Sequence, residues 1–410
     1  MSPQFFVRWQ GLAGFVFFAA SLCMPSGYSW GAALAILLAL SALPHWRKQP
    51  LPRIAWVLAV SFLIFGIFWS HSFDSFWSWR HNDYWIKYAL AALCVLCGSI
   101  IPTPVTAVRW GLMLGGITSG LLAIQQFVGF GRAQGFANAI QFGDLAVLLA
   151  MANWALAAVG KRPWWERLLL IVAGFFAMLA SFLSLSRGGW LLLLVMPLLF
   201  SLFVDKTVLR IKICAVLMLA GSLVLAGILQ IPILAKRIDT IKSEVQSYSA
   251  APASNSETSV GNRLEQWRLA WKMGKEKPIT GWGDQGLIEG KKIYVEKGQA
   301  LPVVLLYGHA HNDVLDMWAR RGAVGLLFLL GIYTVPLYVF YPTAKRRQQI
   351  ADVDRSLWVA LCIVGVSVPV GYFVFGLTQV FFAHNSGHMC YLFIIVFIFS
   401  ALRSVEQKRA

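Results

Sequence analysis

The sequence contains few charged residues for its length. Only 13% of its 410 residues are Asp, Glu, Lys or Arg, whereas 58% are hydrophobic. Soluble globular domains carry about twice that share of charged residues, and disordered chains combine high charge with low hydrophobicity, so the composition excludes both classes. The charges that occur lie in short islands between long apolar runs. The sequence therefore predicts a multispanning membrane protein.

Cysteine is also scarce, and acidic residues are outnumbered by basic ones. The six cysteines fall within predicted apolar spans, which leaves no disulfide framework, and Cys94-x-x-Cys97 is interpreted as two small buried residues. The 35 basic residues against 18 acidic ones give a formal net charge of +17. Because the basic residues flank apolar runs, this charge indicates membrane topology and contact with anionic lipids, not nucleic-acid binding.

Apolar runs long enough to cross a bilayer predict an all-α integral membrane protein with about twelve transmembrane helices. The predicted spans are roughly 6–24, 28–44, 54–70, 85–101, 105–128, 139–160, 165–184, 188–204, 208–229, 320–342, 356–378 and 386–403. The first run lacks an Ala-x-Ala cleavage site and is interpreted as an uncleaved helix. Lys and Arg gather on one side of this alternating model, so the positive-inside rule predicts that both termini are cytoplasmic.

This topology divides the chain into three parts. Residues 1–229 hold the first nine spans, residues 230–319 form one large loop on the outer side, and residues 320–410 hold the last three spans and a cytoplasmic tail.

Within the large loop, two patterns stand out. Leu264, Trp267 and Trp271 share one helical face, which predicts an amphipathic helix lying on the membrane or across the bundle. The run Gly-x-Gly-x-x-Gly from Gly281 to Gly286 matches a dinucleotide-binding fingerprint, but a helix precedes it where that motif requires a strand. These glycines are interpreted as turn residues.

A dense run of titratable side chains lies where the loop meets the tenth predicted span. His309-x-His311 with Asp313 has the spacing of a metal half-site, although the outer loops offer no cysteine ligands and no second acidic or histidine cluster. Alternatively, Asp313 and Asp316 form a capping pair, with His311 hydrogen-bonded at the helix start. The third interpretation is that His311 is a functional group at the membrane surface.

Two features favour that third interpretation. His311 shares a helical stripe with Gly322 and Gly325, and these small residues would let the helix pack tightly against a neighbour and fix the imidazole. The positive end of the helix dipole also disfavours an imidazolium, so the imidazole would be neutral, as a general base must be.

Three arginines are predicted on the same outer side. Arg187 lies in Ser186-Arg187-Gly188 between two spans, Arg132 lies in the loop that leads to Asn138, and Arg263 lies on the amphipathic helix. A lone arginine in such a turn is unremarkable. Together, however, three guanidinium groups near a histidine indicate a polyanionic ligand, since guanidinium forms bidentate contacts with phosphate.

These residues resemble the signature of the O-antigen ligase and polymerase superfamily over roughly residues 130–335. The motifs that carry the resemblance are His311-Asn312 followed by Gly322-Ala-Val-Gly325, Ser186-Arg187-Gly188, Arg263 with Trp267 ahead of Gly281-Trp-Gly283, and Gly135-Phe-Ala-Asn138.

The resemblance implies a bundle like that of C-type glycosyltransferases with one large periplasmic loop. It implies transfer of an O-antigen glycan from undecaprenyl diphosphate to a sugar hydroxyl of the lipid A core oligosaccharide, at the periplasmic face of a Gram-negative inner membrane. By the same resemblance the general base is His311. The diphosphate would be bound by Arg187, Arg263 and Arg132. The residues that support this base and these arginines would be Asn312, Ser186 and Asn138. The reaction would need no metal or other cofactor and would invert the anomeric configuration.

Several alternatives remain open at this stage. An O-antigen polymerase or a protein O-oligosaccharyltransferase would share the motifs, although one dominant outer loop favours the ligase. A polytopic lipid or solute transporter is compatible with twelve spans, but the polar residues concentrate outside the spans and not at the midplane. His384, His388, Arg80 and Gln125 also lie on the outer side, without an assigned role.

Overall fold

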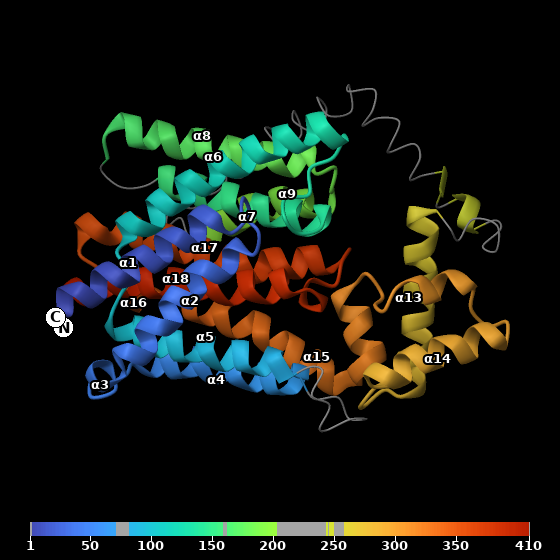
Figure 1. Ribbon diagram of the computed structural model, residues 1–410. Helices are drawn as coiled ribbons and strands as arrows, with labels where there is room; N and C mark the ends of the chain where they lie inside the picture. The colour runs from blue at the N-terminus through green and yellow to red at the C-terminus, as the bar shows by residue number, and fades with distance from the viewer. Residues whose placement is uncertain are drawn as a thin grey trace.

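The computed structural model describes residues 2–70, 82–158, 162–202, 243–244, 246–249 and 258–409. Within these ranges the chain forms helices and no strand, and eight helices are long and apolar enough to cross a membrane. The protein is therefore an all-α, multi-pass membrane protein (Figure 1). The predicted span 208–229 and Arg80 lie outside the described residues.

Eleven of the predicted spans fall on helices of the structure. They are α1 (Pro3–Ala20), α2 (Gly27–Ser41), α4 (Arg53–Ser70), α5 (Asn82–Ile100), α6 (Val105–Phe130), α7 (Ala139–Ala157), α8 (Trp164–Leu183), α9 (Leu191–Leu202), α15 (Asp313–Phe340), α17 (Asp352–Gly376) and α18 (Asn385–Glu406). The eight with the length and hydropathy of a span are α4 to α8, α15, α17 and α18. Short helices α3 (Leu43–Trp46) and α16 (Ala344–Gln348) connect them.

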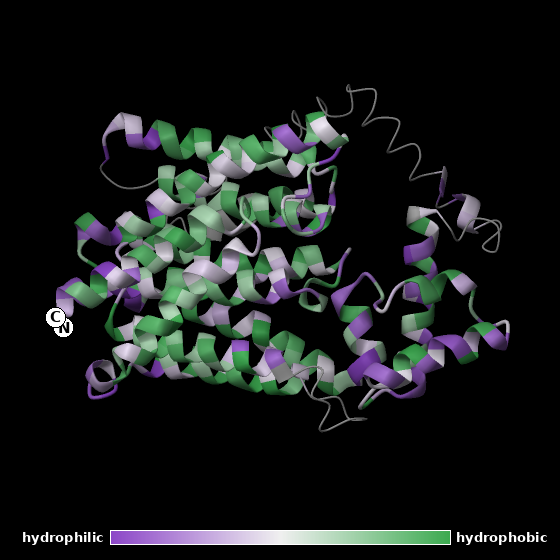
Figure 2. Ribbon diagram, in the orientation of Figure 1, coloured by the Kyte–Doolittle hydropathy of each residue, from purple (hydrophilic) through white to green (hydrophobic). Residues whose placement is uncertain are grey.

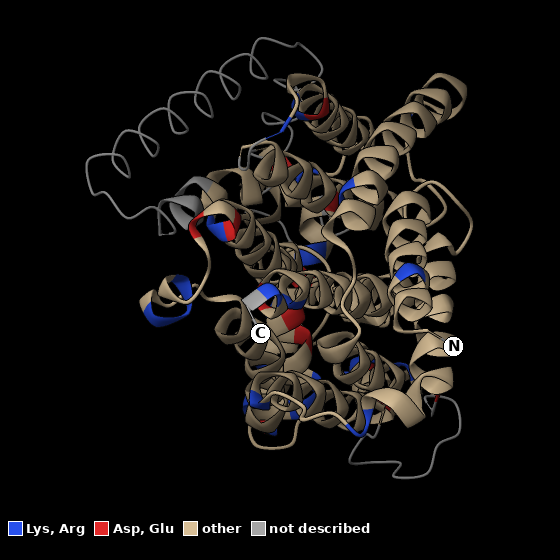
Figure 3. Cartoon of the chain, turned by 90° about the vertical axis from the view of Figure 1, so that its left-hand side faces the viewer, with Lys and Arg blue, Asp and Glu red and all other residues tan. Residues whose placement is uncertain are grey.

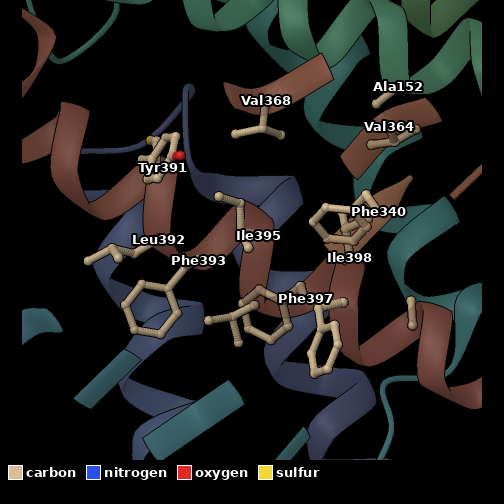
Figure 4. Packing of buried hydrophobic residues seen from close by; sticks show 14 of the residues in the cluster. Ala152, Phe340, Val364, Val368, Tyr391, Leu392, Phe393, Ile395, Phe397 and Ile398 are labelled. Atoms are coloured by element: carbon tan, nitrogen blue, oxygen red, sulfur yellow. The ribbon is translucent and has the colours of Figure 1, made fainter. Parts of the chain in front are cut away.

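Helix α18 lies in the centre of the bundle and is buried on nearly all sides. Its Tyr391, Phe393 and Phe397 have at most 1% of their surface exposed, and Figure 4 shows them among residues of neighbouring helices such as Phe340 and Val364. Helix α7 is buried to a similar degree. A helix that is apolar all round is expected in such a position, so any polar side chain on α7 or α18 must find its partner inside the protein.

Both termini lie at one end of the bundle, and the helices of the large loop lie at the other (Figure 1). Figure 3 views the end with the termini and shows Lys and Arg at several of its helix ends. We call α13 (Ser259–Glu276), α14 (Asp284–Glu296) and the 3₁₀ turn η3 (Pro302–Leu306) the loop lobe. Figure 2 shows that hydrophilic residues are frequent in the loop lobe, whereas hydrophobic residues dominate the bundle.

The loop lobe has a small core of its own. Leu269 and Met273 of α13 pack with Leu287 and Tyr294 of α14 and with Val304 of η3. This core uses a different face of α13 from the one that the sequence pattern predicts. Of the predicted face, Leu264 and Trp267 are half-buried and Trp271 is 52% exposed. The alternation of polar and apolar residues identified an amphipathic helix but not its packed side.

Helix α15 is kinked where it meets the loop lobe. Gly322 has φ 60° and ψ −154°, a conformation that is essentially restricted to glycine. A turn from Pro278 to Gly283 lies against the kink: the N–H groups of Trp282 and Gly283 donate to the carbonyl oxygens of Ala319 and Arg320, at 3.0 and 2.8 Å. The turn role predicted for Gly281 and Gly283 is confirmed by their positive φ angles, whereas Gly286, also predicted as a turn residue, lies in the first turn of helix α14.

The kink corrects one prediction from the sequence. A Cβ atom on Gly322 would lie 2.4 Å from the carbonyl oxygen of Ile279, so the close approach is to the turn of the loop lobe and not to a neighbouring helix. Because the helix bends at Gly322, no continuous stripe runs from His311 to Gly325. The position of the His311 side chain must therefore depend on other contacts.

Candidate active site

The segment that carries His311 joins η3 to α15 and is held at three backbone positions. The Lys291 ammonium donates to the Tyr307 carbonyl at 3.0 Å, and the Arg320 guanidinium donates to the Gly308 carbonyl at 2.8 Å. The N–H of Ala310 donates to Asp316 Oδ1 at 2.9 Å. Six residues without regular secondary structure are thus fixed by side chains of α14 and α15, which is the support that a catalytic geometry needs.

The first turn of α15 is capped by Asn312 and not by Asp313 or Asp316. Asn312 Oδ1 accepts from the N–H of Leu315 at 3.0 Å, and its amide nitrogen donates to the Leu377 carbonyl at 3.0 Å. Asp313 is buried, and its Oδ2 accepts from the Tyr333 hydroxyl at 3.3 Å. Asn312 therefore ties the start of α15 to the turn that follows α17.

His311 has a strained backbone and an ordered ring. Its φ of 53° lies in the left-handed region, which costs a non-glycine residue about 1–3 kcal/mol, and strain of this kind clusters at functional sites. Its Nδ1 lies 2.8 Å from Oε1 of Gln379, and its ring packs edge-on against Tyr307 and His309, at centroid distances of 4.6 and 4.4 Å. These contacts, in place of the predicted helix packing, fix the imidazole.

The surroundings of His311 favour its neutral form. Partial burial lowers the pKa of His311, and the positive charges of Arg263 and Lys291 also lower it. The hydrogen bond with Gln379 and the charge of Asp316 raise this pKa, but the net change is downward. The neutral imidazole predicted from the helix dipole is thus favoured mainly by desolvation. Burial and the neighbouring His311 lower the pKa of His309 to about 4, so His309 is also neutral at physiological pH.

The Ser186-Arg187-Gly188 turn lies between α8 and the 3₁₀ turn η2 (Gly188–Trp190). Leu185, just before it, is another of the three non-glycine residues with positive φ in the described chain. The Ser186 hydroxyl donates to Asp144 Oδ1 at 3.3 Å, and the N–H of Gly189 also donates to the Asp144 carboxylate. Asp144, on the buried helix α7, therefore anchors the turn that carries Arg187.

Arg263 is the arginine that the loop lobe contributes to the predicted set. It is half-buried on α13, and burial lowers its pKa while the charges of the Asp144 carboxylate and Tyr307 raise it. Its own positive charge contributes to the lowered pKa of His311. Arg263 therefore acts electrostatically on groups that are far from it in the sequence.

Arg132 and Asn138 belong to the segment between α6 and α7. The exposed Arg132 donates through Nε to the Ser184 carbonyl at 2.9 Å, close to the turn of Ser186. Asn138 caps α7, because its Oδ1 accepts from the N–H of Gln141 at 2.8 Å. The segment is held by Gln126, whose Oε1 accepts from the N–H of Gly135 at 2.8 Å. Arg132 therefore adjoins the arginine turn, whereas Asn138 has a capping role.

The other histidines on this side differ from each other. His388 is fully buried, and its Nδ1 lies 2.8 Å from the Tyr88 hydroxyl among aromatic rings, which is a packing role. His384 is half-buried, and its Nε2 lies 3.4 Å from the amide nitrogen of Gln379. Among the residues that the structure describes, no group of three or more His, Cys, Asp or Glu side chains could hold a metal ion.

Sequence reasoning missed three residues of this site. Asp144 had a signal, since it is the one acidic residue in the predicted span 139–160, where an ionisable group is a functional candidate. Lys291 is 5% exposed, although the charged face of a loop helix predicts an exposed lysine. Gln379 had no signal at all, because neutral glutamines are common at helix ends and its partner lies 68 positions away.

Comparison with known proteins gives a family for the region that holds these residues. Residues 168–330 match the family model described as O-antigen ligase, a range that includes Arg187, Arg263 and His311. This match supports the chain's membership in the O-antigen ligase and polymerase superfamily. The matched family is one of glycosyltransferase-like membrane enzymes of lipopolysaccharide biosynthesis, whose partners in general are a lipid-linked glycan and an acceptor.

The chain is also similar to an uncharacterized protein of Haemophilus influenzae. The two are 29% identical over 281 residues, which cover 67% of this chain and 68% of that protein.

Proposed function

We propose that this protein is an O-antigen ligase. It transfers an O-antigen glycan from undecaprenyl diphosphate to a sugar hydroxyl of the lipid A core, at the periplasmic face of the inner membrane. The observation that carries the proposal is the ordered His311 at the junction between bundle and loop lobe, with its Nδ1 2.8 Å from Gln379 Oε1; the charge of Arg263 also favours the neutral ring. A neutral base beside fixed positive charge suits an acceptor hydroxyl and an anionic leaving group.

In the proposed reaction the acceptor oxygen attacks the anomeric carbon of the donor sugar. The bond from that carbon to the diphosphate oxygen breaks, and the hydroxyl proton passes to the ring of His311. A single displacement of this kind inverts the anomeric configuration. The donor is already activated by its diphosphate, so the reaction needs neither acid catalysis by a paired carboxylate nor a covalent glycosyl-enzyme intermediate.

Arginines from different elements would receive the leaving group. Arg187 lies in the turn anchored by Asp144, Arg132 donates to the end of α8 beside that turn, and Arg263 approaches from the loop lobe. Guanidinium groups held in place before the reaction stabilise the negative charge that develops on the diphosphate. Asp144 would contribute indirectly, by holding the Ser186 hydroxyl and the Gly189 N–H on either side of Arg187.

The arrangement of the termini supports the proposed orientation. Both termini lie at the end of the bundle opposite the loop lobe, and Lys345, Arg346 and Arg347 are on α16 at a helix connection. Basic connections are typical of the cytoplasmic side. The loop lobe and the candidate site would then be periplasmic, where lipid-linked glycans are joined to lipid A core.

Lipopolysaccharide ladders test the assignment directly. His311→Ala should insert normally and lower ligation by roughly a hundredfold to ten-thousandfold, the range for loss of a general base. Arg187→Ala should cost on the order of a hundredfold or more. The control is His45→Ala, an exposed histidine of α3 at the opposite end of the bundle, which should leave the ladder unchanged. A normal ladder with His311→Ala would remove His311 from the base role.

A second experiment separates the ligase from its relatives. Deletion of the gene should leave lipid-linked polymer to accumulate if the protein is a ligase. Accumulation of single lipid-linked repeat units would identify a polymerase, and loss of protein glycosylation with intact lipopolysaccharide would identify a protein O-oligosaccharyltransferase. An unlinked glycan trapped on the cytoplasmic side would identify a transporter.

A further inference from the structure

Gln379 lies in the turn between α17 and α18 and contacts His311 from the opposite side of the candidate site. It is 4% exposed, and its Oε1 lies 2.8 Å from His311 Nδ1. A histidine nitrogen can donate or accept, so this distance alone does not say which ring nitrogen carries the proton. The answer depends on which end of the Gln379 amide faces the ring.

The backbone of Val380 determines the orientation of that amide. Its N–H, which can only donate, lies 3.2 Å from Gln379 Oε1. Amide oxygen and nitrogen are assigned from such hydrogen bonds, and the reversed amide would set its NH₂ group against this N–H. Oε1 therefore faces both Val380 and His311 as an acceptor, and His311 Nδ1 must be the donor. The remaining ring nitrogen, Nε2, then carries the lone pair.

Neighbouring histidines are consistent with this assignment. The Gln379 amide nitrogen lies 3.4 Å from His384 Nε2 and can donate only if that nitrogen is unprotonated. The N–H of His311 donates to His309 Nδ1 at 3.3 Å, which puts the proton of neutral His309 on its Nε2. None of the hydrogen bonds found among the described residues uses His311 Nε2.

We propose that Gln379 is a positioning residue that holds His311 in the tautomer protonated at Nδ1, so that Nε2 is presented as the base. The inference rests on the proposed function, because it gives Nε2 the task of accepting the proton of the acceptor hydroxyl. In many enzymes the second nitrogen of a catalytic imidazole is hydrogen-bonded to a group that orients the ring, and this group is often a carboxylate. In this protein the orienting group is the neutral amide of Gln379.

The neutral amide has a chemical consequence. A carboxylate in this position would stabilise the imidazolium and raise the pKa of the His311 ring. An amide oxygen carries no net charge, so it raises this pKa less. The charged and titratable groups that act on His311 are Arg263, Lys291, His309 and Asp316, with His384 beyond Gln379. With an amide and two cations nearby, the ring stays neutral at physiological pH while its tautomer remains fixed.

Three variants test the proposal in a purified transfer assay. Gln379→Leu removes the acceptor and should lower kcat roughly tenfold to a hundredfold with an unchanged KM for the lipid-linked donor. Gln379→Glu restores an acceptor, so it should recover most of the rate and shift the acid limb of the pH profile to higher pH. The matched control is Gln141→Leu: Gln141 is equally buried and lies 3.5 Å from the Phe381 carbonyl, but has no contact with His311. It should leave the pH profile unchanged.

A spectroscopic measurement on the wild-type protein makes the test independent of activity and of the Gln379 variants. With ¹⁵N-labelled histidine, the wild-type protein above pH 7 should show His311 protonated at Nδ1 and unprotonated at Nε2, assigned by comparison with His311→Asn. A proton on Nε2, or a wild-type kcat in Gln379→Leu, would overturn the proposal. If the expected tautomer is found in a protein that transfers no glycan, the proposed function fails while the structural role of Gln379 stands.

Discussion

The bundle and the loop lobe bury polar groups in different ways. In the bundle, buried polar residues such as Asp144 and Gln379 lie near one end of an extensive apolar core. In the loop lobe, Glu265, Gln266 and Lys291 are buried in its centre beside a small apolar cluster. The bundle therefore supplies Arg187 in its anchored turn and the acceptor Gln379, the loop lobe supplies Arg263 and Lys291, and the segment between η3 and α15 supplies His311. The candidate site exists only where the two are docked.

The contacts of Arg321 connect the two regions, so breaking them should have the largest effect. This buried side chain donates to the carbonyl oxygens of Phe68 and Trp69 at 2.9 Å and lies 3.2 Å from Asp284 of the loop lobe. Arg321→Met should destabilise the docked loop lobe by about 3–5 kcal/mol, because the carbonyl oxygens of Phe68 and Trp69 each lose a charged donor, while Asp284 keeps its ion pair with Arg320. Limited proteolysis should then cleave the loop lobe faster while circular dichroism shows an intact bundle.

Arg355→Met is the control for this change. Its ion pair with Asp352 is largely exposed, so its loss should cost less than about 1 kcal/mol. Equal cleavage rates in the two variants would show that Arg321 does not hold the regions together.

The kink at Gly322 offers a second way to separate the regions. Gly322→Ala places a Cβ atom 2.4 Å from the Ile279 carbonyl oxygen in a backbone conformation open only to glycine. The change should cost about 3 kcal/mol, measured as thermal stability in detergent. Gly331→Ala is the matched control, because it lies in the same helix with open space around it, and it should stabilise the protein by up to about 1 kcal/mol. Equal melting temperatures would contradict the role of the kink.

Lys291 makes the stability of the loop lobe depend on pH. Burial lowers its pKa to about 8, whereas an unfolded lysine titrates near 10.5. Between these values the unfolded state binds more protons than the folded state, so stability should rise with pH across this window, by at most about 3 kcal/mol for a difference of about 2.5 pH units. Tryptophan fluorescence melts should show this gain in the wild type and lose it in Lys291→Met. Lys292→Met, an exposed neighbour, should keep it.

The smallest effect concerns the rate at acidic pH. Because the pKa of His311 is lowered, the neutral ring should predominate at pH 7, and activity should fall as pH drops through that lowered pKa. Lys291 is charged in this range and contributes to the lowering, so Lys291→Met should move the acid limb to higher pH. An acid limb that stays in place would show that the loop-lobe charges do not reach the histidine.

Parts of the candidate site could be read from the sequence because their residue types are unusual in their positions. His311, Arg187 and Arg263 are charged or titratable groups beside apolar spans, and Gly281 and Gly283 are typical of a turn. Gln379 could not be found in this way, since an amide at the end of a helix has no distinctive pattern. The packed face of α13 was also not predictable, because its buried side contains Glu265 and Gln266, which find partners only in the folded loop lobe.

The sequence by itself determined the class of the protein and its helices. Apolar runs in a lipid solvent must close their backbone hydrogen bonds within each segment, so the local pattern is sufficient to predict helices that span a membrane. Tertiary structure decided which side chains meet. The contacts of His311 with Gln379, of Asp144 with Ser186 and of Gly322 with Ile279 join residues that are distant along the chain. Contacts of that kind depend on how the helices pack, and packing depends on shape and charge complementarity that no local pattern records.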